Sequence, residues 1–232
     1  MIRGIIETSF LDWDGKIVMV LYTPRCNFRC PFCHNWELLE NPEKYPEKSW
    51  RSVSASLRKH RDFLDGVCIT GGEPLLEPDI EDWLAKVKRL GMLIKIDTNG
   101  SCPDVLESLL EKKLVDYVAM DVKGPLDKRY DAATGIKTDL KKIRRSIDII
   151  RCSKIDYEFR TTVVPGIHSK EDIADIAKAL QKPKRYVLQQ FVPFHAKNET
   201  LRETKPYDNE TIMDMADACS KHVGKMAVRG LR

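Results

Sequence analysis

Residues 26–33 read Cys-Asn-Phe-Arg-Cys-Pro-Phe-Cys and follow an apolar run, residues 17–23, that is typical of a buried strand. Three cysteines in one short loop indicate an iron–sulfur cluster or zinc, because soft thiolates favour those metals. A 4Fe-4S cluster has four irons, so Cys26, Cys30 and Cys33 would hold three of them and leave the fourth open to a substrate. The spacing therefore favours a reactive cluster over a sealed structural one.

His34 follows the third cysteine directly and keeps a second interpretation open. Cys₃His is a standard ligand set for structural zinc, so the loop alone is also compatible with zinc. Disulfides fit less well, because the chain has seven cysteines, an odd number, and shows no signal-peptide pattern. The remaining cysteines are scattered, and we expect no second cluster among them: Cys68, Cys102, Cys152 and Cys219.

A second motif, Gly71-Gly72-Glu73-Pro74, follows the apolar run at residues 67–70. Two glycines at a strand end would let a ligand approach the backbone closely. Glu73 would then offer a carboxylate to a cationic amine. Because the motif lies one βα unit after the cysteine loop, we expect both to contribute to one site.

Strand-like and helix-like segments alternate from residue 16 onward. Amphipathic helices, such as residues 79–90 ending at Gly91, separate the strands, which indicates βα units and a parallel sheet. Right-handed crossovers curl such a sheet toward a barrel. We predict one α/β domain over residues 1–232, with an N-terminal extension at about 1–15, a core at about 16–223 and a short C-terminal tail. The six expected strands are residues 17–23, 66–70, 92–97, 115–121, 155–164 and 186–192.

Polar residues and glycines gather where the predicted strands end. Active sites of parallel α/β folds lie at the carboxyl ends of the strands, so this placement predicts one shared site. The residues concerned are Cys26, Gly71, Asp97, Asp121, Arg160 and His195.

The composition narrows the class of protein. A net charge of +4 with interspersed acids and bases gives no reason to expect a nucleic-acid partner. The longest apolar stretch, residues 17–22, is far too short to span a bilayer, and the first residues lack the apolar region of a signal peptide. We therefore expect a cytoplasmic protein that does not bind membranes.

Together, the Cys-x₃-Cys-x₂-Cys loop and the Gly-Gly-Glu-Pro motif resemble those of the radical S-adenosylmethionine (SAM) superfamily. The resemblance implies a partial (β/α)₆ barrel in which Cys26, Cys30 and Cys33 hold a 4Fe-4S cluster. It further implies that the amino and carboxylate groups of SAM bind the fourth iron, and that the segment from Gly71 to Pro74 contacts the methionine amine. An electron from the cluster would then cleave SAM to methionine and a 5′-deoxyadenosyl radical.

Two further strand ends each allow two interpretations. Residues 97–100, Asp-Thr-Asn-Gly, could form a plain turn, or a polar shelf on which Asn99 and its neighbours hold the ribose. Asp121 and Lys123 share one face of an extended chain. They could form a local salt bridge, or Lys123 could pair with the SAM carboxylate.

Six segments narrow the resemblance to the glycyl-radical-enzyme activating enzymes, including the activators of pyruvate formate-lyase and of anaerobic ribonucleotide reductase. In that family the position of Lys123 contacts the SAM carboxylate, that of His195 contacts the ribose or adenine, and that of Phe32 packs near the adenine. The positions of Asp97, Thr98 and Asp121 form a monovalent-cation site in the formate-lyase activator. The segments are residues 26–35, 71–75, 97–100, 121–123, 160–166 and 193–195.

The resemblance predicts that the partner is a glycyl radical enzyme, with anaerobic ribonucleotide reductase preferred, and that a flavodoxin or ferredoxin donates the electron. Two alternatives stay open at this point. The chain could be a radical SAM enzyme for a small molecule or another macromolecule, such as a deazaguanine-forming enzyme. It could also be a non-catalytic adaptor that binds zinc at the cysteine loop.

Overall fold

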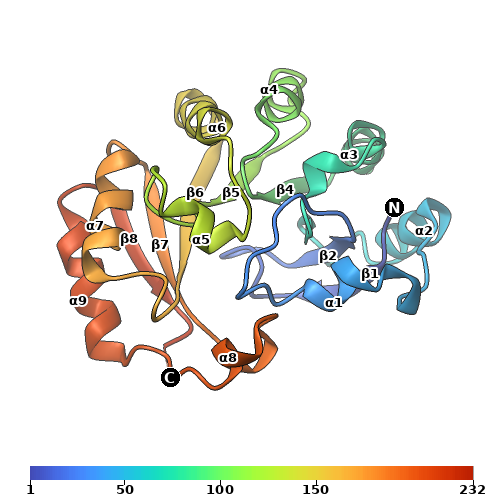
Figure 1. The fold of residues 1–232 in the computed structure, drawn as a ribbon. Coiled ribbons are helices and arrows are strands. Elements are labelled where there is room, and N and C mark those ends of the chain that lie inside the picture. The colour runs from blue at the N-terminus through green and yellow to red at the C-terminus, as the bar shows by residue number, and fades with distance from the viewer. Residues whose placement is uncertain (232) are drawn as a thin grey trace.

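Eight strands form one sheet in the computed structural model, which describes residues 1–231 (Figure 1). The strands lie in chain order, with β1 antiparallel to β2 and every later neighbouring pair parallel. In the described chain β1 and β8 do not pair with each other, so the sheet stays open as a partial barrel, as predicted. The strands are β1 Gly4–Ser9, β2 Val18–Thr23, β3 Gly66–Gly71, β4 Leu93–Thr98, β5 Tyr117–Asp121, β6 Asp156–Val163, β7 Arg185–Gln190 and β8 Lys225–Arg229.

Helices cover the outer side of this curved sheet. Figure 1 shows α2, α3, α4, α6, α7 and α9 following one another around the outside, which is the arrangement that repeated βα units produce. The α-helices are α1 Trp36–Glu40, α2 Trp50–Lys59, α3 Ile80–Arg89, α4 Pro103–Glu111, α5 Tyr130–Thr134, α6 Leu140–Cys152, α7 Lys170–Ala179, α8 Glu199–Arg202 and α9 Asn209–Ser220. Three 3-10 turns complete the described elements: η1 Pro42–Lys44, η2 Pro74–Leu76 and η3 Pro193–His195.

Polar side chains explain where several helices begin. Ser169 accepts a hydrogen bond from the backbone N–H of Asp172, and the Asp172 carboxylate accepts one from the N–H of Ser169 in return. This reciprocal capping box satisfies two backbone donors that the first turn of α7 would otherwise leave unpaired. Ser49 caps α2 with a single hydrogen bond, which its side chain accepts from the N–H of Ser52.

The two faces of the sheet are packed differently. Met19 and Leu21 of β2 belong to the large core between the sheet and the outer helices. Val18 and Val20 point to the opposite face, where they form a small cluster with Trp13 and Cys68. Trp13 therefore covers the inner face near the start of β2. Toward the carboxyl ends of the strands, polar residues line the inner face instead.

Each end of the chain adds a strand to the sheet that was not predicted from the sequence. Within the expected extension, Gly4–Ser9 pairs with β2, and within the expected tail, Lys225–Arg229 pairs with β7. Both are partly exposed edge strands, so they lack the continuous apolar run that identified the six inner strands. The region 38–49, expected as a loop, contains the end of α1 and the turn η1, which are too short to show helical periodicity.

Candidate active site

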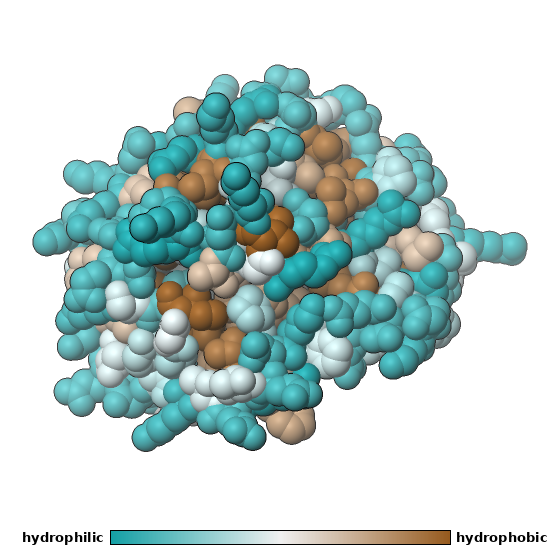
Figure 2. All heavy atoms as spheres, in the orientation of Figure 1, coloured by the Kyte–Doolittle hydropathy of each residue, from teal (hydrophilic) through white to brown (hydrophobic). Residues whose placement is uncertain are grey.

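A cavity of about 500 Å³ opens at the carboxyl ends of the parallel strands. Its walls include the cysteine loop after β2, the glycines after β3 and the ends of β4, β5 and β6. Seen in the same orientation as Figure 1, apolar residues gather toward the middle of this face and hydrophilic residues surround them (Figure 2). All of the predicted site residues except Glu73 and His195 line the cavity: Cys26, Cys30, Phe32, Cys33, Gly71, Gly72, Asp97, Thr98, Asn99, Asp121, Lys123 and Arg160.

The three loop cysteines are free thiols that face this cavity. Cys30 is buried and the other two are half-buried. Burial raises the pKa of all three thiols, that of Cys30 to about 12, although the ammonium of Lys123 acts in the opposite direction. Without a metal the thiols are therefore protonated, and binding of a metal would release protons.

Backbone contacts hold the cysteine loop in place. The N–H of Arg29 donates to the carbonyl of Thr134 at 2.8 Å, and the Arg29 guanidinium donates to the carbonyl of Cys26 at 2.8 Å. The side-chain amide of Asn99 lies 3.8 Å from the Cys26 sulfur. The loop is thus tied to the last residue of α5 and to the residue that follows β4.

The donor set offers three thiols, which is the number that a 4Fe-4S cluster with one open iron requires. Among residues 1–231 no three His, Cys, Asp or Glu side chains are grouped so that they could hold a single metal ion. A cubane instead spreads three thiolates over three separate irons. His34, the predicted fourth ligand of a zinc site, has its Nε2 atom 3.0 Å from the carbonyl oxygen of Val192, to which it is hydrogen-bonded.

Gly71 ends β3 and Gly72 follows it, and at both positions the neighbouring backbone packs too closely to leave room for a side chain. A Cβ atom on Gly71 would collide with the backbone of Thr23, and one on Gly72 would collide with the carbonyl of Arg25. The N–H groups of Gly72 and Glu73 donate to Thr23 and Arg25 at 2.8 and 2.5 Å. The motif therefore holds the start of the cysteine loop against β3, and the approach of a ligand to these glycines stays a prediction.

Glu73 is fully buried and its carboxylate faces β4 rather than the cavity. It accepts hydrogen bonds from the hydroxyl of Thr98 at 2.7 Å and from the backbone N–H of Asn99 at 2.6 Å. Burial raises its pKa to about 7, against the opposing effect of these donors. In this chain the carboxylate orients the polar shelf at residues 97–100, and the contact between Glu73 and a ligand amine stays a prediction.

Two carboxylates and three basic side chains form a charged cluster on the inner face, defined as Lys95, Asp97, Asp121, Lys123 and Arg160. Arg160 lies between the acids, with Nε 2.9 Å from Asp121 and Nη1 3.0 Å from Asp97. The register of β5 and β6, which places Asp121 opposite Arg160, creates this contact. Although burial works against both charges, Arg160 and the neighbouring lysines lower the pKa of Asp97 and hold that of Asp121 at about 2.

Lys123 pairs with Asp121 at 3.0 Å, so the salt bridge considered from sequence is formed. Its Nζ also lies 5.8 Å from the centre of the Phe32 ring. The sequence did not single out His168, which is buried and fixes the Lys123 backbone: Nδ1 accepts from the N–H of Val164, so Nε2 donates to the Lys123 carbonyl at 2.7 Å. Burial lowers the pKa of His168, which keeps the ring neutral.

His195 is exposed in η3 and does not line the cavity. Its ring centre lies 4.8 Å from that of Phe194 and 6.1 Å from that of His34. His34, which the sequence suggested only as a zinc ligand, is the histidine that lines the cavity. A contact between His195 and a nucleoside stays a prediction.

The family model described as the radical SAM superfamily matches residues 20–188 of this chain. The chain belongs to the radical SAM superfamily. This match spans β2 to β7 and includes the whole cavity wall built by the cysteine loop and the charged cluster. Membership implies a 4Fe-4S cluster and SAM, in line with the fit of the thiols.

Curated relatives place this radical SAM chain among the glycyl-radical-enzyme activating enzymes. A protein of Methanocaldococcus jannaschii named "Putative glycyl-radical enzyme activating enzyme" is 34% identical over 99% of this chain and 95% of its own length. The pyruvate formate-lyase-activating enzyme of Clostridium pasteurianum is 28% identical over 84% of this chain and 82% of its own.

Solved structures agree on the fold of this radical SAM chain. SuiB of Streptococcus suis bound to SAM superposes with a TM-score of 0.69 at 19% identity, over 91% of this chain. This chain spans about half, 50%, of SuiB. A domain of a pyruvate-formate lyase-activating enzyme from Bacteroides vulgatus gives 0.54 at 19% identity, over 71% of this chain and 99% of that domain. At such identities the likeness shows the fold alone.

Several cavity residues were not found from the sequence of this radical SAM chain. They come from the β1–β2 connection and from β2, β6, β7 and β8, and they carry no motif spacing, so only the curvature of the sheet brings them together: Asp12, Tyr22, Thr162, Gln189, Gln190 and Arg229. Across residues 1–231, none of the helices has both the length and the apolar character required to cross a bilayer.

Proposed function

We propose that this protein activates a glycyl radical enzyme by removing a hydrogen atom from a backbone glycine of that partner. The observation that carries the proposal is that three free thiols share one cavity with a charged cluster of net positive charge. Cys26, Cys30 and Cys33 would hold the cluster. When bound, the reduced cluster supplies the electron that cleaves SAM to methionine and a 5′-deoxyadenosyl radical.

The protein's own residues would bind and orient SAM. Lys123 and Arg160 would present positive charge to the methionine carboxylate. Phe32, whose ring lies beside the Lys123 ammonium in the cavity wall, would offer an apolar surface to the adenine. Glu73 would act indirectly, because it fixes Thr98 and Asn99 at the cavity wall. The family resemblance also implies a monovalent cation beside Asp97 and Asp121. In this chain the oxygens of both carboxylates already have basic partners, so the need for such a cation is considered below.

A peptide substrate suits the rest of the cavity. Gln189, Thr162 and Tyr22 line part of its wall with amide and hydroxyl groups, which can pair with a backbone without requiring a particular side chain. Beside this wall β1 and β8 leave the described sheet open. A glycine segment of a partner could enter there, because glycine allows a close approach of backbone.

The proposed reaction also requires a protein partner, an electron donor and a cellular location. We propose anaerobic ribonucleotide reductase as the partner, a flavodoxin or ferredoxin as the electron donor, and the cytoplasm as the location. Support for the donor class is chemical: the reaction consumes one low-potential electron, which small iron–sulfur or flavin proteins supply. A single catalytic domain over the whole chain belongs to the same proposal.

The deciding experiment is anaerobic reconstitution with iron and sulfide, followed by dithionite and SAM, with and without the candidate glycyl radical enzyme. Deoxyadenosine is quantified and electron paramagnetic resonance is recorded on the same sample. A partner-dependent glycyl doublet supports the proposal. Deoxyadenosine without a doublet would leave radical SAM chemistry intact and indicate a small molecule or another macromolecule as substrate.

Cysteine variants test the cluster separately. Cys26→Ala, Cys30→Ala and Cys33→Ala should each abolish iron retention and deoxyadenosine formation. The matched control is Cys152→Ala, which removes an exposed thiol outside the cavity and should leave both unchanged. Full iron content and normal cleavage in any loop variant would overturn the assignment.

Lys123→Ala tests the carboxylate contact. We expect SAM affinity to fall by about 1.5–3 kcal/mol, the usual value of a hydrogen bond to a charged group, while iron content stays near that of the wild type. Lys123→Arg, which keeps the charge, should restore part of the affinity. Unchanged affinity in the alanine variant would remove Lys123 from the proposed binding site.

A further inference from the structure

The carboxylates of Asp97 and Asp121 have a basic partner at each of their four oxygens. Asp97 Oδ1 lies 2.7 Å from Lys95 Nζ, and Asp97 Oδ2 lies 3.0 Å from Arg160 Nη1. Asp121 Oδ1 lies 2.9 Å from Arg160 Nε, and Asp121 Oδ2 lies 3.0 Å from Lys123 Nζ. A cation that bound these carboxylates would have to share every oxygen with an ammonium or a guanidinium.

Lys95 is the member of the charged cluster that no motif in the sequence had indicated. It lies between Ile94 and Ile96 of β4, which point into the outer core, so its own side chain points to the inner face. Only 2% of the residue is exposed. Besides Asp97, its Nζ donates to the carbonyl of Asp12 at 2.5 Å.

A buried ammonium must be compensated, because its removal from water costs several kcal/mol. Lys95 meets this requirement with the Asp97 carboxylate and the Asp12 carbonyl. Lys95 is therefore a permanent positive charge placed directly behind the cavity wall.

The charge balance of the cluster leaves no role for another cation. Three basic side chains face two carboxylates, which gives one net positive charge before any ligand binds. One ligand carboxylate would neutralise that charge. An added K⁺ or Na⁺ would leave one positive charge uncompensated even after that carboxylate had bound, which Coulomb repulsion disfavours in a buried site.

We propose that Lys95, together with Arg160, supplies the positive charge that a monovalent metal ion would otherwise supply, so that this protein binds SAM without such an ion. The inference rests on the proposed function, because it concerns the same SAM site. It makes Lys95 a positioning residue: by pairing with Asp97 it lets the cluster keep one positive charge in excess, which Lys123 and Arg160 present to the ligand carboxylate.

The test compares SAM affinity of the cluster-loaded protein in potassium chloride and in tetramethylammonium chloride at equal ionic strength. Tetramethylammonium carries the same charge but cannot bind carboxylates as K⁺ does. For the wild type we expect dissociation constants that agree within about twofold, well below the tenfold change that 1.4 kcal/mol produces. An affinity at least tenfold higher in potassium would overturn the inference while supporting the proposed function.

Lys95→Met removes the ammonium but keeps a long apolar side chain. We expect its SAM affinity to fall at least about tenfold in tetramethylammonium and to recover in part when potassium is added, because Asp97 Oδ1 is then free for K⁺. Lys88→Met is the matched control, because Lys88 of α3 also pairs with an aspartate, Asp116, at 2.5 Å but lies outside the cavity. The SAM affinity of this variant should not respond to potassium. A Lys95→Met variant with unchanged affinity in both salts would overturn the role of Lys95.

A second measurement needs neither the cluster nor SAM. The melting temperature of the metal-free wild type should be the same in the two salts, since no cation site needs to be filled. A melting temperature several degrees higher in potassium would show a bound ion and overturn the inference, even if Lys95→Met failed to fold. If the loaded protein bound no SAM in either salt, the proposed function would fail, and this comparison would still decide the ion question.

Discussion

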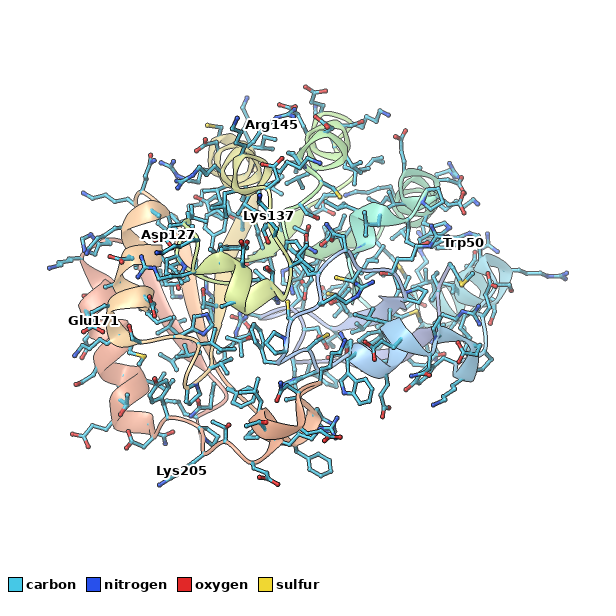
Figure 3. The ribbon with its side chains drawn as sticks, viewed as in Figure 1. Trp50, Asp127, Lys137, Arg145, Glu171 and Lys205 are labelled. Carbon is cyan, nitrogen blue, oxygen red and sulfur yellow. The ribbon has the colours of Figure 1, made fainter. Side chains whose placement is uncertain are left out.

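Arg160 on the inner face and Arg145 on the outer ring each hold two acidic side chains, yet their surroundings differ completely. Arg145 of α6 pairs with Asp104 and with Glu107 at 2.7 Å, and Figure 3 shows it at the rim of the molecule. Arg160 is 8% exposed and pairs with Asp97 and Asp121 inside the cavity. Water and salt screen the outer group, whereas the inner group depends on the protein for every partner.

Salt bridges between the same residue types therefore have different consequences on the two faces of the sheet. The outer acids and bases keep the helices hydrated and link α4 to α6, and their loss leaves each partner solvated by water. In the inner group, removal of one member leaves a buried charge without its partner. The first prediction below compares the two faces directly, and the next two ask how much a buried carboxylate and a crowded glycine contribute.

Arg160→Met should have the largest effect on stability. It leaves Asp97 and Asp121 with one basic partner each, and the loss of a buried partner typically costs about 3–5 kcal/mol. The free energy of unfolding, measured by urea denaturation, gives the change directly. Arg145→Met should leave the urea midpoint where it is, so equal losses in the two variants would contradict the distinction between the two faces.

Glu73→Gln should change how stability depends on pH. The pKa of Glu73 is raised to about 7 in the folded state, against about 4.3 in an unfolded chain. Between these values the folded protein binds the extra proton, so the wild type should lose stability as pH rises from about 4.3 to 7, by on the order of 3 kcal/mol. The variant cannot titrate and should show a flatter profile across this window. Urea midpoints at several pH values measure both slopes, and parallel profiles would count against a buried, protonated Glu73.

Gly72→Ala and Gly91→Ala should separate crowding from backbone strain. Gly72 lies against the Arg25 carbonyl, while Gly91 has a φ of +76° and nothing near its missing Cβ. We expect Gly91→Ala to cost about 1–2 kcal/mol through its left-handed backbone and to retain full iron after reconstitution. Gly72→Ala should displace the start of the cysteine loop and lower iron content. Normal iron content in Gly72→Ala would show that the loop does not depend on this contact.

Much of the fold and part of the site could be predicted from sequence because local spacing determines them. The cysteine loop, the strand ends and the alternation of strands with amphipathic helices all follow from residues near one another in the chain. The edge strands β1 and β8 were missed since partial exposure removes the apolar signal. Short helices such as α5 and α8 were missed since they hold barely one turn.

By itself, the sequence determined the chemistry available to this protein: three thiols in one loop, acids and bases at strand ends, and glycines beside them. Only the tertiary structure decided which of these groups meet. Asp121 reaches Arg160 through the register of β5 and β6, Lys95 reaches the carbonyl of Asp12 across 83 residues, and Glu73 faces away from the cavity. The physical reason is that spacing fixes neighbours within a loop, whereas contacts between strands depend on how the whole sheet curves and pairs.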